Sequence, residues 1–187
     1  MTDLAKKRVV YENLFDIPDN MTGEIINGEL IATPRPSRKH SVVISRVGFE
    51  LGPPYDFGRG GGPGGWVIVD EPEISFGENI LVPDMAGWKK ERFPVEEPHN
   101  WISVAPDWVC EILSPTTVQV DRAEKMPIYA QHHVLHAWLI DPIVKTLELF
   151  RLESGRWVLL GVYAQSARVH AEPFPEIELD LGLLWLE

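Results

Sequence analysis

The stretch Ala105–Pro115 reads Ala-Pro-Asp-Trp-Val-Cys-Glu-Ile-Leu-Ser-Pro, and the interpretation of the whole chain starts from it. Within it, Trp108–Leu113 is an apolar run typical of a buried β-strand, and Ser114 and Pro115 end that run. One carboxylate, that of Glu111, lies inside the run. An unpaired charge inside a sheet costs several kcal/mol, so Glu111 is a candidate functional residue.

A second carboxylate occupies a related position upstream. Asp84 follows Pro83 at the end of another apolar strand, 27 residues before Glu111. If the two strands are neighbours, the carboxylates meet, and their mutual repulsion favours a divalent cation between them, Mg²⁺ above all. The alternative is structural: Asp84 caps a turn, and Glu111 pairs with an arginine or faces solvent at the end of its strand.

The first part of the chain predicts a hairpin followed by a helix. Asn27 and Gly28 separate two short apolar-rich runs within Glu24–Ile31, which is the strongest local signal for a β-hairpin because both residues tolerate a positive φ. The apolar residues of Ser41–Leu51 fit one buried stripe of a helix, which Pro53 should end.

The remainder predicts short strands around one more helix. We expect strands in these ranges: Trp66–Val69, Glu73–Phe76, Asn79–Ala86, His136–Asp141, Thr146–Arg151 and Trp157–Tyr163. A helix is expected over Asp121–His132, although Pro127 is tolerated only in its first turn. The glycine-rich Gly58–Gly65 lacks the Gly-Lys-Ser/Thr ending of a phosphate-binding loop, and we interpret it as a flexible connection.

Together these elements predict an α+β fold, with a mostly antiparallel or mixed central sheet flanked by helices. The 187 residues are expected to form one domain, residues 1–187, in which 161–187 is an extension packed on the rest. The net charge of −11 disfavours long-range attraction to nucleic acid or anionic membranes. A single cysteine, Cys110, excludes an internal disulfide and favours a reducing, cytoplasmic location. Neither a signal peptide nor a membrane span is expected.

Several ordered motifs carry a resemblance to a known family. They are Glu24, Asn27–Leu30, Pro36-Ser37 with His40, Val82-Pro83-Asp84, Ala105–Pro115, Asp121–Lys125, Tyr129 and Trp138–Pro142. Over roughly residues 11 to 160 the chain resembles the Uma family of bacterial putative restriction endonucleases, in the PD-(D/E)XK nuclease superfamily. The resemblance implies a restriction-endonuclease-like core that cleaves phosphodiester bonds with a divalent metal ion.

The resemblance also assigns roles to individual residues. Asp84 and Glu111 match the two acidic metal ligands, and Glu24 matches an upstream acid that completes the metal shell. The superfamily usually has a lysine two positions after the second acid, but here that position is Leu113. Lys125 matches a lysine of the Uma proteins on the following helix, and it would assist the attacking water and offset charge. The alternative for Lys125 is a solvated helix residue.

The remaining expectations concern His40, the cofactor and the binding partners. His40 opens the helix after the hairpin beside Arg35, Arg38 and Lys39, where it would contact the phosphate or support the metal shell, unless it is a solvated helix start. The expected cofactor is Mg²⁺, with Mn²⁺ as a substitute. The expected partner is DNA, bound weakly or with help from another protein, and cutting both strands implies a homodimer. Two other functions remain open: an interaction or regulatory module with lost activity, marked by Leu113, and a phosphodiesterase acting on RNA or a small nucleotide.

Overall fold

A six-stranded sheet forms the centre of the computed structural model, which describes residues 9–186. Its order is β10-β9-β8-β7-β6-β3, and all neighbours are antiparallel except β7 and β8, which are parallel. The strands are β3 Trp66–Asp70, β6 Met85–Lys89, β7 Trp108–Ile112, β8 His136–Asp141, β9 Thr146–Glu153 and β10 Arg156–Ala164. The parallel pair requires a long crossover, which the second helical segment supplies.

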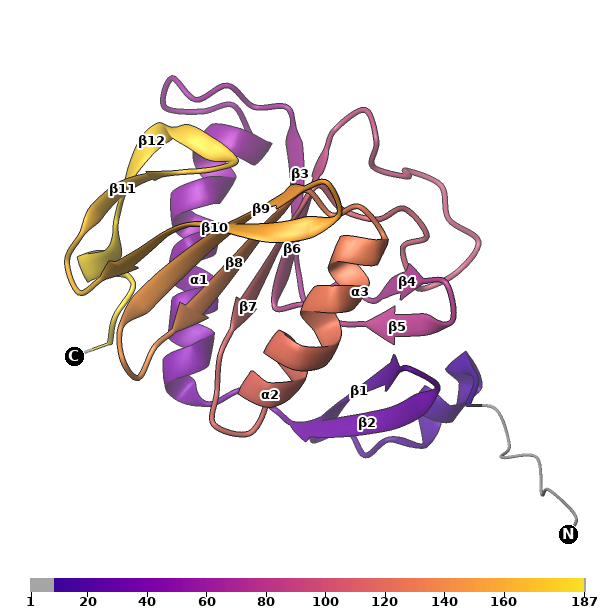
Figure 1. Ribbon diagram of the computed structural model, residues 1–187. Helices are drawn as coiled ribbons and strands as arrows, with labels where there is room; N and C mark the ends of the chain where they lie inside the picture. The colour runs from indigo at the N-terminus through magenta and orange to yellow at the C-terminus, as the bar shows by residue number, and fades with distance from the viewer. Residues whose placement is uncertain (1–8, 187) are drawn as a thin grey trace, which may run out of the picture.

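A second sheet of four strands, in the order β2-β1-β5-β4, lies at one end of the central sheet (Figure 1). Its strands are β1 Met21–Ile26, β2 Glu29–Pro34, β4 Ile74–Phe76 and β5 Asn79–Leu81. The predicted hairpin is confirmed: Ile26 pairs with Glu29, and the two turn residues Asn27 and Gly28 have φ values of 52° and 79°. Both angles lie in the region that the favoured two-residue hairpin turns require.

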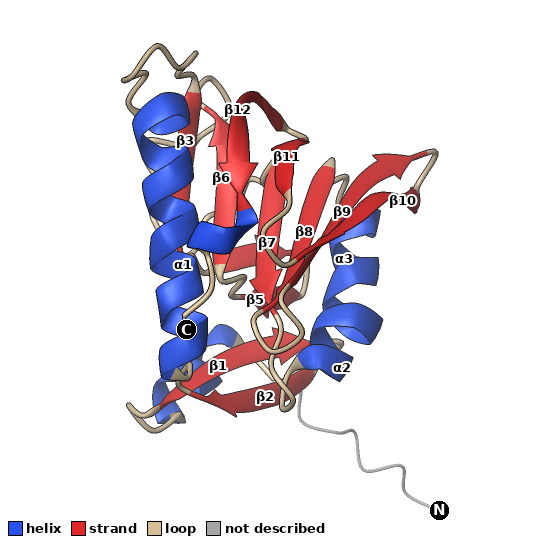
Figure 2. Ribbon diagram, turned by 90° about the vertical axis from the view of Figure 1, so that its left-hand side faces the viewer, coloured by secondary structure: helices blue, strands red, loops and turns tan. Residues whose placement is uncertain are grey.

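Helical segments cover the two faces of the central sheet (Figure 2). Helix α1, Arg38–Leu51, packs on one face, and α2 Val118–Val120, the π-helical turn η3 Asp121–Lys125 and α3 Met126–Gln131 follow one another on the other. The remaining elements are η1 Tyr11–Asp16, η2 Gly52–Asp56, β11 Arg168–Ala171, β12 Phe174–Asp180 and η4 Leu181–Leu183. The α+β architecture with a mixed, helix-flanked sheet is therefore as predicted.

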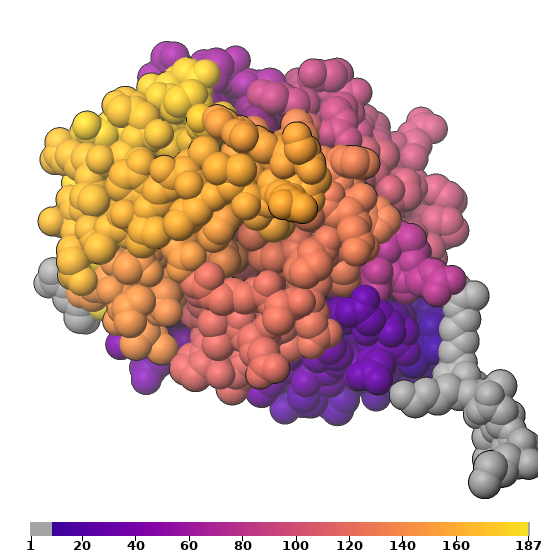
Figure 3. All heavy atoms as spheres, viewed as in Figure 1, coloured from indigo at the N-terminus to yellow at the C-terminus, as the bar shows by residue number. Residues whose placement is uncertain are grey.

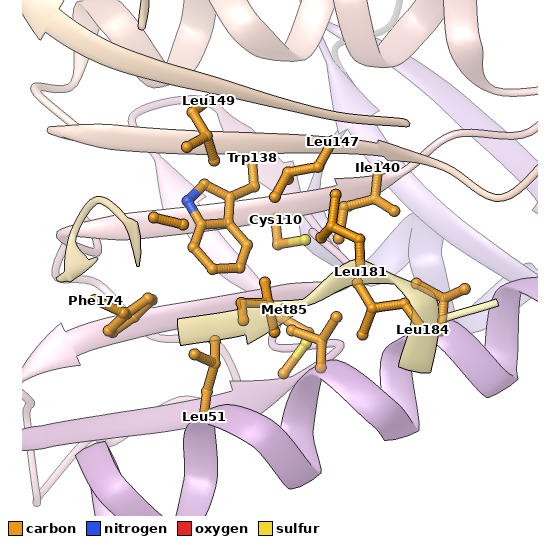
Figure 4. Close-up of a cluster of buried hydrophobic side chains, with 14 of the residues drawn as sticks. Leu51, Met85, Cys110, Trp138, Ile140, Leu147, Leu149, Phe174, Leu181 and Leu184 are labelled. Carbon is orange, nitrogen blue, oxygen red and sulfur yellow. The ribbon is translucent and has the colours of Figure 1, made fainter. Parts of the chain in front are cut away.

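Strand β7 divides the interior into two cores because its side chains alternate between the faces of the sheet. Trp108, Cys110 and Ile112 belong to the core beneath α1, which the C-terminal residues complete (Figure 4). Val109 belongs to the core beneath α3, and so does Leu113, just beyond the strand. Glu111 shares the parity of Val109, so its carboxylate lies on the side of the sheet that η3 and α3 cover. The C-terminal segment contributes Val169, Phe174 and Leu184 to the core beneath α1.

Three predicted elements differ from the structure by more than a shift of up to three residues at one end. The strand expected over Asn79–Ala86 is two strands, β5 and β6, which belong to different sheets. Pro53 does not end the first helical segment, because the chain continues through it as the π-helical turn η2. The second helical segment begins at Val118 and ends at Gln131, and Pro127 lies in the first turn of α3, where its missing N–H is tolerated.

The described residues contain no transmembrane candidate: no helix between residues 9 and 186 is both long and apolar enough to cross a membrane.

Candidate active site

Glu111 lies in the middle of the central sheet and is 2% exposed. It pairs with Leu139 of β8 on one side, and on the other side the pairing of β7 with β6 ends at the preceding residue, where Cys110 pairs with Met85. Its carboxylate oxygen Oε1 accepts a hydrogen bond from the hydroxyl of Tyr129 and lies 2.9 Å from Nζ of Lys125. The structural alternative of an arginine partner or a solvent-facing side chain is therefore wrong for Glu111.

Asp84 lies in the short connection where the chain leaves β5 and enters β6, in the other sheet. Its Oδ2 accepts a hydrogen bond of 2.6 Å from the backbone N–H of Ile112, the residue after Glu111. This bond holds the β5–β6 connection against the end of β7. The carboxylates of Asp84 and Glu111, which were predicted to be neighbours, therefore lie near the same end of β7. The break between β5 and β6, which the sequence pattern missed, is what turns Asp84 toward β7.

Lys125 is buried, with 3% of its side chain exposed, so the alternative of a solvated helix residue is wrong. Besides Glu111, its ammonium group lies 3.1 Å from Oε1 of Glu24, and it donates a hydrogen bond of 3.2 Å to the carbonyl of Val82. Leu113, at the position where the superfamily has its lysine, packs in the apolar core beneath α3. The structure thus brings a lysine to Glu111 from the helical segment rather than from the strand.

Glu24 and His40, the two residues expected to support the metal shell, also lie beside Lys125 and Asp84. Glu24 on β1 is buried, and its Oε1 accepts a hydrogen bond of 2.7 Å from the backbone N–H of Val82. His40, in the first turn of α1, is also buried, and its Nε2 lies 3.1 Å from Oδ1 of Asp84. The solvated helix start considered for His40 is therefore wrong.

Two further residues of the site were not predicted. Asp121 at the start of η3 is buried, and its Oδ1 lies 3.8 Å from Nζ of Lys125. Tyr129 in α3 is fully buried. The available signal was spacing, because Asp121 lies four residues before Lys125 and Tyr129 four residues after it, the separation that brings helical side chains together.

The acidic and basic side chains of the site share one cavity of about 290 Å³. Glu24, His40, Asp84, Glu111, Asp121 and Lys125 all line it. Arg35, Ser37 and the Ser114–Thr117 connection also line it. Figure 3 shows the surface of the hairpin β1–β2 lying against that of the segment that contains α2 and η3.

The charges of the site are unbalanced. Burial would lower the pKa of Lys125, but the carboxylates of Glu111 and Glu24 outweigh it and raise this pKa well above its usual value. Burial raises the pKa of Glu111 well above its usual range, and Lys125 only partly opposes this effect. Burial likewise raises the pKa of Asp121, against the attraction of Lys125. One ammonium group therefore faces more buried carboxylates than it can neutralise, an arrangement that favours a bound cation.

The oxygen donors of the site fit a magnesium ion better than a metal held entirely by side chains. Within residues 9–186, no group of three or more His, Cys, Asp or Glu side chains forms a ready-made metal site. Mg²⁺, however, keeps several water molecules and is held in proteins by one or two carboxylates together with substrate phosphates. Asp84 and Glu111 supply such a pair in a cavity large enough for water molecules and a phosphate group.

Comparison with known proteins gives a family match and a similar solved structure. A family model described as "Uma2: putative restriction endonuclease" matches residues 11–182. Among solved structures, a "putative nuclease belonging to DUF820" from Anabaena variabilis is similar with a TM-score of 0.76 and 26% sequence identity. That alignment covers 94% of this chain and 97% of the other. A search of curated proteins gives no match.

Proposed function

The chain belongs to the Uma2 family of putative restriction endonucleases, and from this we propose that it is a Mg²⁺-dependent endonuclease that hydrolyses phosphodiester bonds of DNA. The observation that supports the proposal most strongly is that Asp84, Glu111 and Lys125 line one cavity although they come from three separate elements.

In this proposal Asp84 and Glu111 hold the divalent cation, with Mn²⁺ as a substitute, and Glu24 supports its shell. The cation, when bound, lowers the pKa of a water molecule and polarises the phosphate group. A water molecule loses a proton to solvent and adds to phosphorus, one phosphorus–oxygen ester bond breaks, and the leaving oxygen takes up a proton. The products are a phosphate monoester and a free hydroxyl group.

Lys125 and His40 are the other two residues to which the proposal gives a role in the reaction. The raised pKa of Lys125 keeps its ammonium group charged, so it can offset the negative charge that develops on the phosphate oxygens. In this role it replaces the lysine that is absent at Leu113. His40 orients the carboxylate of Asp84 through its Nε2, 3.1 Å from Oδ1.

The site also supports contact with the sugar–phosphate backbone. Ser37, Ser114, Thr116 and Thr117 present hydroxyl groups at the cavity, and Arg35 adds a cation. Hydroxyl and guanidinium groups are common phosphate contacts. Since the net charge is −11, affinity for DNA should be weak or depend on a partner. The proposal includes a homodimer, because cutting two strands needs two sites, and a cytoplasmic location.

The test combines metal binding with cleavage. Mg²⁺ and Mn²⁺ are titrated calorimetrically into the wild type, Asp84→Asn and Glu111→Gln, and nicking of a plasmid is followed with and without a chelator. We expect both variants to lose metal binding and nicking. Glu178→Gln, which changes a half-exposed carboxylate of a surface ion pair with Arg168, is the matched control and should behave like the wild type.

The outcomes separate the proposed function from its alternatives. Absence of metal binding at millimolar concentration together with absence of nicking would overturn the nuclease and favour the interaction module. Metal binding with cleavage of RNA but not of DNA would instead favour a ribonuclease built on the same metal chemistry.

A further inference from the structure

Tyr129 is a buried polar residue that the proposed reaction does not use. Its side chain is fully buried on α3, and its ring packs edge-on against Phe76 at a centroid distance of 5.4 Å. Its hydroxyl donates a hydrogen bond to Oε1 of Glu111, which lies on β7 and 18 residues away in the sequence. The bond therefore connects the helical segment to the strand that carries the second carboxylate of the site.

Two donors converge on the same oxygen of Glu111. Nζ of Lys125 lies 2.9 Å from Oε1, the atom that Tyr129 also contacts, whereas Oε2 takes part in neither contact. A carboxylate is symmetric and can rotate about its last bond, so a donor that selects one oxygen also determines where the other one lies. Because Glu111 lines the cavity, Oε2 is the oxygen left for a ligand there.

We propose that Tyr129 is a positioning residue, whose hydroxyl holds Oε1 of Glu111 so that Oε2 faces the cavity and binds the divalent cation. This inference rests on the proposed function and assigns to that site a residue that does not itself touch metal or substrate. Metal ligands are commonly oriented by such outer hydrogen bonds, and loss of one weakens metal affinity by about 10- to 100-fold.

Lys125 alone would fix this carboxylate less well. Its ammonium group also lies 3.1 Å from Glu24 and 3.2 Å from the carbonyl of Val82, so its donors are shared. It is carried on a flexible stem, whereas the tyrosine ring has few rotatable bonds and is enclosed by the core beneath α3. The hydroxyl of Tyr129 therefore provides the more rigid of the two contacts.

A control variant distinguishes a positioning role of Tyr129 from a purely structural one, and Tyr55 provides that control. Tyr55 is also fully buried, and its hydroxyl donates a 2.9 Å hydrogen bond to Oε2 of Glu176. Tyr55 does not line the cavity that contains Glu111. Replacing either tyrosine by phenylalanine removes one hydroxyl and its hydrogen bond to a glutamate side chain, and Tyr55→Phe also removes the bonds that this hydroxyl accepts from the backbone N–H groups of Glu176 and Ile177. Only the bond of Tyr129 is at the site.

The experiment measures Mg²⁺ affinity by calorimetry, without nucleic acid, for the wild type, Tyr129→Phe and Tyr55→Phe, together with urea unfolding of each. We expect Y129F to bind Mg²⁺ about 10- to 100-fold more weakly. Y55F should bind it within twofold of the wild type, whatever stability it loses. In the nicking assay the Mg²⁺ concentration for half-maximal rate should rise in Y129F, while the rate at saturating Mg²⁺ is largely restored.

Several results would overturn the inference. Wild-type Mg²⁺ affinity in Y129F would show that Lys125 positions Glu111 alone, and equal weakening in both variants would show a general effect of stability. Failure of the wild type to bind Mg²⁺ would overturn the proposed function and this inference with it.

If Y129F does not fold, the wild type itself provides the second measurement. A cation on Glu111 changes the charge that the hydroxyl of Tyr129 faces, so Mg²⁺ should produce a tyrosine ultraviolet difference spectrum that persists in Y55F. Calorimetric binding without such a spectrum would overturn the inference.

Discussion

Lys125 is the residue on which the charge balance of the site depends most. Its ammonium group is buried beside Glu111 and Glu24, and removal of one partner of a buried ion pair costs about 3–5 kcal/mol. We therefore expect Lys125→Met to lower the free energy of unfolding by about that amount. Urea unfolding in the presence of a chelator measures it.

The matched control is Arg168→Met. Arg168 forms an ion pair with Glu178 at 3.2 Å, but its side chain is 64% exposed, and pairs of this kind contribute about 0–1 kcal/mol. If Lys125→Met and Arg168→Met lower the free energy of unfolding equally, the burial and pairing of Lys125 are contradicted.

His136 predicts a pH dependence that is independent of the site. Burial lowers its pKa below the usual value, although Glu172 at 3.5 Å opposes the shift. A histidine whose pKa is depressed by folding binds its proton more readily in the unfolded chain. Its full contribution to stability is therefore present above the unfolded pKa of about 6.5 and is lost as the pH falls below that value.

The comparison of wild type with His136→Gln checks this sign. As the pH is lowered from 7.5 to 5.5, the free energy of unfolding should fall more steeply for the wild type than for H136Q. Parallel curves for the two proteins would contradict the prediction.

Two glycines test whether the hairpin and the first helix are held as described. Gly28 has a φ of 79°, and an added Cβ would meet no atom within 4 Å, so Gly28→Ala should cost about 1–2 kcal/mol through the backbone alone. Gly48 lies within α1, and its Cβ would be 3.7 Å from Cε of Met85, an ordinary contact. Gly48→Ala should therefore stabilise by up to about 1 kcal/mol. Thermal and urea unfolding should both show that Gly28→Ala lowers the stability and that Gly48→Ala raises it. A change of the same sign in both variants would contradict this account.

Elements with a strong local signal were predictable from the sequence. Asn27 and Gly28 determine their turn through their own backbone preferences, and the apolar run of β7 is long enough to identify a buried strand. The break between β5 and β6 was not predictable, because the apolar pattern continues through it. Only the hydrogen bond from Ile112 to Asp84 and the pairing with different sheets distinguish the two strands.

The helical segment shows the same limit. Its helical character followed from spacing, but its irregular course, with a π-helical turn between two short α-helices, did not. That turn has Asp121 at one end and Lys125 at the other, and single π-helical turns are frequent at functional sites. Asp84, Glu111 and Lys125 were identified as a set by their resemblance to a family. Asp121 and Tyr129 stand in motifs of the same resemblance, but only the fold shows their contacts with Lys125 and Glu111.

The whole molecule carries a net charge of −11, yet its cavity opens beside a small group of exposed cations, Arg35, Arg38 and Lys39. Each phosphate neutralised by a cation contributes about −0.9 to the slope of log affinity against log salt concentration. If the nucleic acid enters through this mouth, we expect a slope no steeper than about −3, far shallower than for proteins with extended basic surfaces. Fluorescence anisotropy of a labelled DNA, with Ca²⁺ in place of Mg²⁺, measures the slope.

Single variants then locate the contact. Arg38→Gln and Lys39→Gln should each make the slope shallower by about 0.9 and weaken binding at low salt, because each removes one phosphate contact. Arg168→Gln, which removes an exposed cation of the C-terminal hairpin, should leave the slope unchanged. A steep slope that is insensitive to Arg38 and Lys39 but reduced in R168Q would place the DNA on the opposite part of the molecule. The cavity that holds Asp84 and Glu111 would then not be where the backbone is cut.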